Sequence, residues 1–116
     1  MPYSFEAKED IAAYTIVKFF DGGIKAASAA DDELIGITGS LDVPAGNSAD
    51  VYMTGERIEV KAGAPFAAGK VLTADSAGCA VSAAAGDNII AIALESASAE
   101  GDIVQALVTC QRTIGA

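Results

Sequence analysis

The amino-acid sequence predicts an all-β fold, a small β-barrel or sandwich built from two similar halves, with at most short helical turns and an extended N-terminal arm. Three observations support this. Short β-branched segments alternate with turn residues, the same order of segments appears twice, and the apolar residues are mostly aliphatic, with no Trp and only 6% aromatics. A chain of 116 residues can bury about two thirds of its unfolded surface, so a single domain can be stable without disulfides or a structural metal.

The repeat is visible when the sequence is shifted by 55 positions against itself, which places Asp32 on Asp87 (87 − 32 = 55). We therefore expect a single domain, 1–116, with an arm at 1–9, units at 10–57 and 65–112, and a link at 58–64. Two copies are too few for a solenoid, so each half should cover the apolar face of the other. The shift also aligns Gly23 with Gly78, Ile35 with Ile90, Ile37 with Ile92, Gly46 with Gly101, and Arg57 with Arg112.

In the first unit, "YTIVKFF" has the β-branched and aromatic residues of a strand, and Asp21-Gly22-Gly23 supplies the positive φ of a hairpin turn. "IKAAS" is the return strand, "ADDE" a turn, and "LIGIT" a strand in which Gly36 marks a bulge or a close backbone approach. "VPAGNSA" is the next turn, and "DVYMTG" alternates as a strand up to Gly55. This order indicates antiparallel strands joined by short turns.

The second unit repeats that order in "GKVLTA", "DSAG", "CAVSA", "AAGDN", "IIAIALESA", "SAEGD" and "IVQALVTCQ". Alanine runs at 26–30 and 80–85 have helix propensity but are short and flanked by turn signals. We therefore expect no more than one helical turn in each half.

The arm carries Tyr3 and Phe5, which alternate with polar residues and so share one face of an extended segment. Such a segment can add to a partner as a strand, complete its own sheet, or fray. The sequence leaves these alternatives open.

Composition and motifs argue against catalysis, cofactors, metals and nucleic acid. The net charge of −9 repels phosphate and anionic membrane surfaces, and no apolar run reaches 18 residues. The absence of histidine excludes Ser-His-Asp and Cys-His arrangements, and no phosphate-binding glycine motif is present. The acidic run 31–33 lacks the alternating spacing of a calcium loop, so we interpret it as a solvated turn.

Two residue pairs remain open. Cys79 and Cys110 are not equivalent under the shift, so we interpret them as reduced thiols, although a single bridge between them is not ruled out by sequence. Arg57 and Arg112 end the two units. The favoured interpretation of these arginines is an internal ion pair with Glu56, Glu59 or an aspartate of the other half, and the alternative is an ion pair with a partner.

The order of "DIAAYTIVKFFDGGIKAA", "DDELIGIT", "VPAGNSADVYMTGERIEVKAGAPFAAGKVLTADSAG" and "IIAIALESASAEGDIVQALV" resembles the bacteriophage capsid cement, or head-decoration, family. The chain departs from the family pattern at Tyr14 and Ala91, where glycine is usual. Residues that follow the pattern are Gly36, Gly55, Gly63, Gly69, Gly78, Ala93-Leu94, Gly101-Asp102 and Val104.

The resemblance implies a structural virion protein, not an enzyme, that binds the outer surface of an assembled head and cements neighbouring major capsid proteins. It implies a homotrimer, assembled in the host cytoplasm and located on the capsid exterior. The candidate capsid or subunit contacts are Pro2, Tyr3, Phe5, Arg57 and Arg112.

Two other functions are compatible with a small β fold. A carbohydrate- or small-ligand-binding module of the adhesion type needs stacking aromatics, and most aromatics here lie in strand-like runs that we expect to be core. A biotinyl- or lipoyl-type carrier needs a lysine at a hairpin tip, whereas Lys25 and Lys61 lie off the predicted turns.

Overall fold

The computed structural model describes residues 3–29, 33–84 and 86–111, and the side chains of 110 and 111 are outside this description. The described residues form strands and turns without a helix, which confirms the all-β prediction. The strands are β1 (Tyr3–Glu6), β2 (Ile16–Phe20), β3 (Gly23–Ala26), β4 (Leu34–Thr38), β5 (Ser48–Tyr52), β6 (Arg57–Lys61), β7 (Val71–Ala74), β8 (Ala80–Ser82), β9 (Ile89–Ala93) and β10 (Ile103–Gln111).

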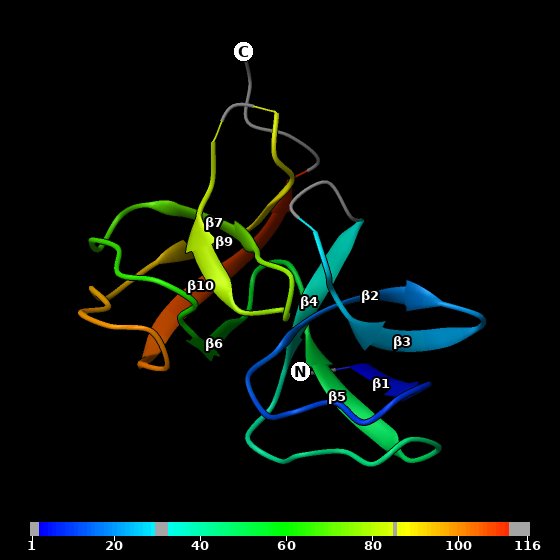
Figure 1. The fold of residues 1–116 in the computed structure, drawn as a ribbon. Helices are drawn as coiled ribbons and strands as arrows, with labels where there is room; N and C mark the ends of the chain where they lie inside the picture. The colour runs from blue at the N-terminus through cyan, green and yellow to red at the C-terminus, as the bar shows by residue number, and fades with distance from the viewer. Residues whose placement is uncertain (1–2, 30–32, 85, 112–116) are drawn as a thin grey trace.

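The strands form two five-stranded antiparallel sheets, with the orders β1-β5-β4-β2-β3 and β6-β10-β9-β7-β8. Figure 1 shows them as two neighbouring lobes. The shift of 55 positions relates the sheets strand by strand and even in register, because Ile37 pairs with Tyr52 where Ile92 pairs with Leu107. The prediction of two similar halves is therefore confirmed.

Each sheet curls until its two edge strands meet. In the first half Ala7 bridges Ile24 in parallel, and in the second half Ala62 bridges Ala80 in the same way. Because these bridges join the ends of each sheet, each half is a small barrel with little free strand edge.

The first strand of each barrel lies outside the units expected from the sequence. β1 occupies the expected arm and pairs with β5, and β6 occupies the expected link 58–64 and pairs with β10. The arm thus completes its own sheet. The first sheet spans residues 3–52 and the second spans 57–111, so β1 and β6 are equivalent strands.

Each barrel encloses its own apolar interior. The first interior contains Ala7, Ile11, Val17, Ile24, Ile35, Ala49 and Val51. The equivalent positions of the second barrel include Ala62, Phe66, Leu72, Ile90, Val104 and Ala106, all buried. The interiors are filled mainly by aliphatic side chains, as the composition predicts.

The outer face of the first sheet packs against the second half. Ile16, Leu34 and Ile37 point away from the first interior and join the buried cluster of the second half. The Ile16 N–H donates to the Gly78 carbonyl at 2.8 Å, and the Lys61 N–H donates to the Tyr14 carbonyl at 3.1 Å. The expectation that each half covers the other is met in this direction only, because Val71, Ile92 and Leu107 on the outer face of the second sheet are only half-buried.

Tyr14 shows how closely the halves correspond. Its φ of 57° lies in the left-handed region, which costs a residue with a side chain free energy. The equivalent position is Gly69, with a φ of 89°. The departure from the family glycine therefore preserves the turn, and the Lys61 hydrogen bond helps to hold Tyr14 in it.

Candidate functional site

The first candidate surface is β1, which presents Tyr3 to solvent. Tyr3 pairs with Val51 of β5, whose side chain points into the first barrel, so Tyr3 lies on the same face of the sheet. Tyr3 itself is 61% exposed. Phe5 lies two residues on, is half-buried, and packs against the first interior. Of the arm residues predicted as contacts, Tyr3 is therefore available to a partner and Phe5 mainly supports the barrel. Pro2 lies outside the described residues.

Two further aromatics lie beside this strand, at the β2–β3 turn. Phe19 and Phe20 are 55% and 47% exposed. The Phe19 ring meets the Phe5 ring edge-on, with centroids 5.5 Å apart and an interplanar angle of 76°. Lys25 Nζ lies 4.3 Å from the centroid of the Phe20 ring. The projecting hairpin is visible at the right of Figure 1, above β1.

The expectation that such aromatics are core residues is wrong for Phe19 and Phe20. They close a strand whose earlier residues, Ile16 and Val17, are buried. The signal that distinguishes them is the turn Asp21-Gly22 immediately after, because residues at the tip of a two-residue hairpin project beyond the packed interior. We call Tyr3, Phe19 and Phe20 the exposed aromatics, of which Phe19 and Phe20 are consecutive in β2 and so face opposite sides of the sheet.

Of the two arginines, the structure describes only Arg57. Arg57 is exposed at the start of β6 and pairs with Leu107 of β10, while Arg112 lies outside the described residues. Across the part of the chain that is described, Arg57 forms no salt bridge with Glu56 or Glu59. The exposed side chain of Arg57 is accessible to solvent.

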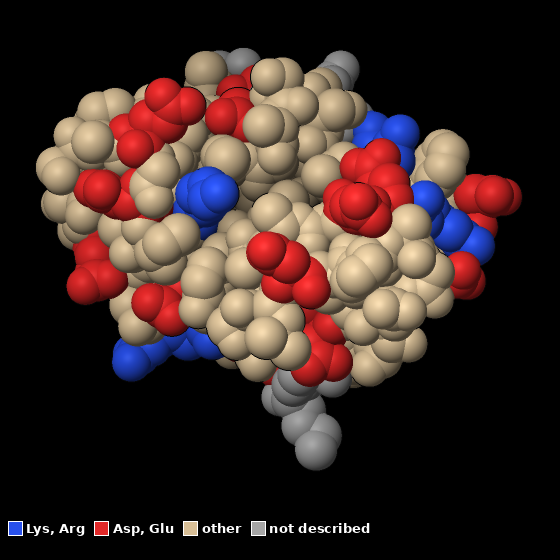
Figure 2. Space-filling view, turned by 60° about the horizontal axis from the view of Figure 1, so that its bottom comes forward, with Lys and Arg blue, Asp and Glu red and all other residues tan. Residues whose placement is uncertain are grey.

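Most charged groups visible in Figure 2 are acidic and scattered, with few basic groups among them. Such a surface favours solubility and suits docking on a basic partner.

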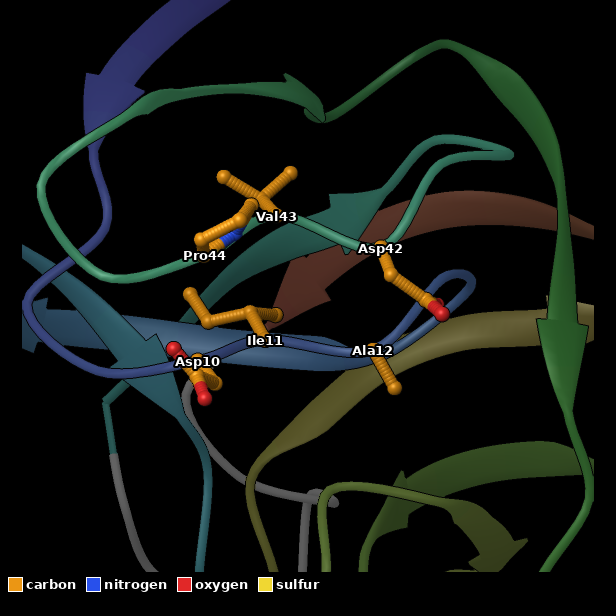
Figure 3. A pocket seen from close by; sticks show the side chains of 6 residues that line it. All are labelled: Asp10, Ile11, Ala12, Asp42, Val43 and Pro44. Atoms are coloured by element: carbon orange, nitrogen blue, oxygen red, sulfur yellow. The ribbon is translucent and has the colours of Figure 1, made fainter.

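A shallow hollow of about 430 Å³ opens beside the loop before β5 and is shown in Figure 3. Its two carboxylates already have structural roles, because Asp10 Oδ1 accepts from the Ala45 N–H and Asp42 Oδ1 accepts from the Ala13 N–H, each at 2.9 Å. Nowhere in the described ranges do three potential metal ligands cluster. The hollow is lined by Asp10, Ile11, Ala12, Asp42, Val43 and Pro44.

Among the described residues, Cys79 is a free, half-buried thiol. Burial, and then the nearby Asp75 carboxylate, raise the pKa of this thiol, which disfavours the reactive thiolate. The side chain of Cys110 lies outside the description. No helix within the described segments is long and apolar enough to cross a membrane.

The described residues form a double barrel with exposed aromatics at one turn. The model of the phage cement protein family matches residues 1–110, and the chain belongs to that family. The resemblance noted in the sequence is thereby confirmed.

The crystal structure of the head fiber gp8.5 N base in bacteriophage phi29 has a similar fold. Its TM-score is 0.69 at 23% sequence identity, covering 100% of this chain and 98% of that chain. At this identity the likeness supports the fold alone. No curated protein matches the chain significantly. Family membership supports a structural role in the phage head and indicates a virion component.

Proposed function

We propose that this protein binds the outer surface of an assembled phage head as a homotrimer and cements neighbouring major capsid proteins. The observation that carries the proposal is the family match over residues 1–110. On this proposal the protein assembles in the host cytoplasm, lies on the capsid exterior, and catalyses no reaction.

The physical properties of the fold support such a role. A cementing protein must transmit force between neighbours, and two closed barrels that share hydrogen bonds and a buried cluster form a stiff unit. Its contacts need area and shape complementarity more than a deep cavity. The closed sheets also limit uncontrolled strand pairing when many copies are made.

Tyr3 is the residue of β1 best placed to contact the capsid. It combines a large apolar ring with a hydroxyl, and tyrosines of this kind are enriched at the energetic centres of protein interfaces. Phe5 would act indirectly, by holding β1 and Phe19 in place. Pro2 and Arg112 stay predicted contacts, and Arg57 is the exposed cation for a neighbouring subunit.

The proposal is tested by mixing the protein with expanded, undecorated heads and measuring how much of it sediments with them. We expect saturable binding, and a Tyr3→Ser variant should bind roughly 30-fold more weakly. Leu41→Ser is the matched control, because Leu41 is also an exposed large apolar residue but belongs to the loop between β4 and β5 and not to β1. No sedimentation of the wild-type protein with any head preparation would refute the function.

Deletion of the arm is a poor substitute for this point variant. β1 pairs with β5 along its length, and Ala7 is completely buried behind it. Removing these residues would open the first barrel, and loss of binding would then report unfolding.

A carbohydrate-binding function has one observation in its favour. A second hollow, of about 140 Å³, includes Tyr52, Asp50, Ser40 and Ser48, which are chemically suited to a sugar. It is smaller than the roughly 300–1,000 Å³ typical of small-ligand sites. Binding of the protein to a glycan array, with loss of that binding in Tyr52→Ala, would support this alternative over capsid cementing.

A further inference from the structure

The two halves carry the same cross-strand row of side chains on their outer faces. In the first half the row is Tyr52, Ile37 and Ile16, which are paired in register across β5, β4 and β2. In the second half it is Leu107, Ile92 and Val71, paired in the same way across β10, β9 and β7. We call these the first row and the second row.

The rows differ in what covers them. Ile16 and Ile37 are completely buried, because the second half of the same chain packs on the first row. The three residues of the second row are only half-buried. The two isoleucines of the first row are thus covered, whereas Tyr52 at its end and all three residues of the second row are partly open to solvent.

The turn between β7 and β8 is part of what covers the first row. The Gly78 carbonyl accepts the Ile16 N–H at 2.8 Å. This glycine sits so close that a Cβ added to it would lie 2.7 Å from Thr15 Cγ2. The turn of the second half therefore abuts the start of β2, beside the first row.

The equivalent turn of the first half, between β2 and β3, packs within its own half, where Phe19 meets Phe5 of β1, and it leaves Phe20 exposed. It is closed by the pair Phe20 and Gly23 around Asp21 and Gly22, whereas the β7–β8 turn is closed by Ala74 and Ala80 around residues 75–79. Where the second turn carries Asp75, whose carboxylate accepts the Ala77 and Cys79 N–H groups, the first carries the exposed Phe20.

In this chain the β7–β8 turn therefore packs beside the first row. The equivalent β2–β3 turn, which we call the free turn, and the second row are both partly open to solvent. One pair of charges is complementary, and Lys25 adds a positive charge over the Phe20 ring. Asp21 is exposed on the free turn, and Arg57 is exposed beside Leu107 at the end of the second row. In a chain of net charge −9, a local cation at this place lowers the repulsion between copies.

We infer that a second copy of this chain covers the second row, and that it does so with its β2–β3 turn. The contact repeats between copies the packing that already exists between the halves. It is heterologous, so each copy offers its turn to one neighbour and its row to another, and the series closes into a ring. This inference rests on the proposed homotrimer and supplies the surfaces through which it forms.

The test is the mass of the protein in solution, measured by sedimentation equilibrium without heads. Wild type should form a ring of defined mass. Phe20→Asp, which installs the residue of the equivalent turn, and Ile92→Glu, which charges the row, should each weaken association roughly 30-fold. Leu41→Glu should keep the wild-type mass, because Leu41 lies on neither surface.

Mixing the two variants distinguishes this contact from a symmetric one. Phe20→Asp retains a working row and Ile92→Glu retains a working turn, so an equimolar mixture should form a heterodimer and nothing larger. If turn met turn or row met row, every contact in the mixture would include an altered surface, and the mixture would stay monomeric. A monomeric mixture would overturn the inference, as would a monomeric wild type or variants that keep the wild-type mass.

Ile92→Glu could instead fail to fold, because Ile92 is half-buried. Circular dichroism would detect such unfolding. In that case, photo-crosslinking from a benzoylphenylalanine placed at position 20 of the otherwise wild-type protein tests whether the turn contacts the second row of another copy. Crosslinks to peptides within β9 or β10 of another copy support the contact, and crosslinks confined to other segments overturn it. Since no heads are present, failure here leaves the sedimentation test of the proposed function independent.

Discussion

At position 36 the first half carries glycine, whereas at the equivalent position 91 the second half carries alanine. A Cβ on Gly36 would lie 2.5 Å from the Tyr52 carbonyl oxygen and 2.6 Å from Val51 Cγ1. In the second half Val51 is replaced by Ala106, and Ala91 fits with no exposure to solvent. The two barrels thus have equivalent backbone positions, but the side chains that fill the two interiors differ in size.

The aromatic residues show the same division more broadly. Six of the seven lie in the first half, and the second half has only Phe66. The second interior is correspondingly rich in alanine, at positions 62, 74, 80, 91, 93 and 106. The comparison indicates that the second barrel covers the isoleucines of the first row, while the first barrel carries the exposed aromatics.

The largest effect should come from truncating the two rows. Ile37→Ala removes a completely buried side chain between the halves and should lower the free energy of unfolding by about 4 kcal/mol. Ile92→Ala, its equivalent, should cost about 1 kcal/mol, because the wild-type side chain is already partly solvated. Urea unfolding in dilute solution, where copies do not associate, measures both. Equal costs would contradict the difference between the rows.

The second comparison exchanges the residues at positions 36 and 91. Gly36→Ala should cost about 3 kcal/mol, since the new methyl group meets a backbone oxygen that cannot move far. Ala91→Gly should cost about 1 kcal/mol through lost burial and added backbone freedom. Thermal unfolding of both variants measures the costs. Adding Val51→Ala to Gly36→Ala should recover only part of the loss, because the Tyr52 oxygen remains.

Two turns should respond identically. Gly46 and Gly101 have φ values of 91° and 94°, and no atom lies within 4 Å of an added Cβ at either position. Gly46→Ala and Gly101→Ala should therefore each lower the free energy of unfolding by about 1 kcal/mol, from backbone conformation alone. Chemical denaturation that found one substitution neutral would show that the halves differ in this turn.

The smallest expected effect concerns Asp102, whose equivalent in the first half is Asn47. Hydrogen bonds from the Ser98 backbone N–H, the Ser98 hydroxyl and the Ala99 N–H lower the pKa of the Asp102 carboxyl below its ordinary 3.8. A lowered folded-state pKa contributes stability above the ordinary value, and that contribution is lost as the pH falls through the folded-state pKa.

Asp102→Asn should therefore be slightly less stable than wild type at about pH 7 and no different at about pH 2. Unfolding midpoints across this range measure the difference. A difference in unfolding midpoint that did not change with pH would mean that the charge of Asp102 does not stabilise its turn.

Much of the fold follows from local sequence signals. The β-branched runs, the turn glycines and the 55-residue period predict the segments of β2 to β5 and of β7 to β10, because strand propensity and turn chemistry act over a few neighbouring residues. The first strand of each barrel was missed as part of the repeat, since Tyr3 and Phe5 match Ile58 and Val60 only in apolar character. Register, and not residue identity, makes them equivalent.

The candidate site was less predictable. Alternation in the arm predicts Tyr3 as a contact, and the repeat predicts Arg57. The sequence does not predict the exposure of Phe19 and Phe20, because they lie in a strand-like run that is mostly apolar. Their exposure depends on where the barrel ends, which is set by contacts between distant strands.

The sequence by itself determined the period, the strands, the turns and the family, since each of these is written in short-range patterns of residue type. The tertiary structure alone decided that the first row is covered while the second is partly open. Ile37 and Ile92 are the same residue in equivalent strands, and local preference cannot tell them apart. Only the position of one barrel against the other, through contacts such as that of Gly78 with Ile16, makes them different.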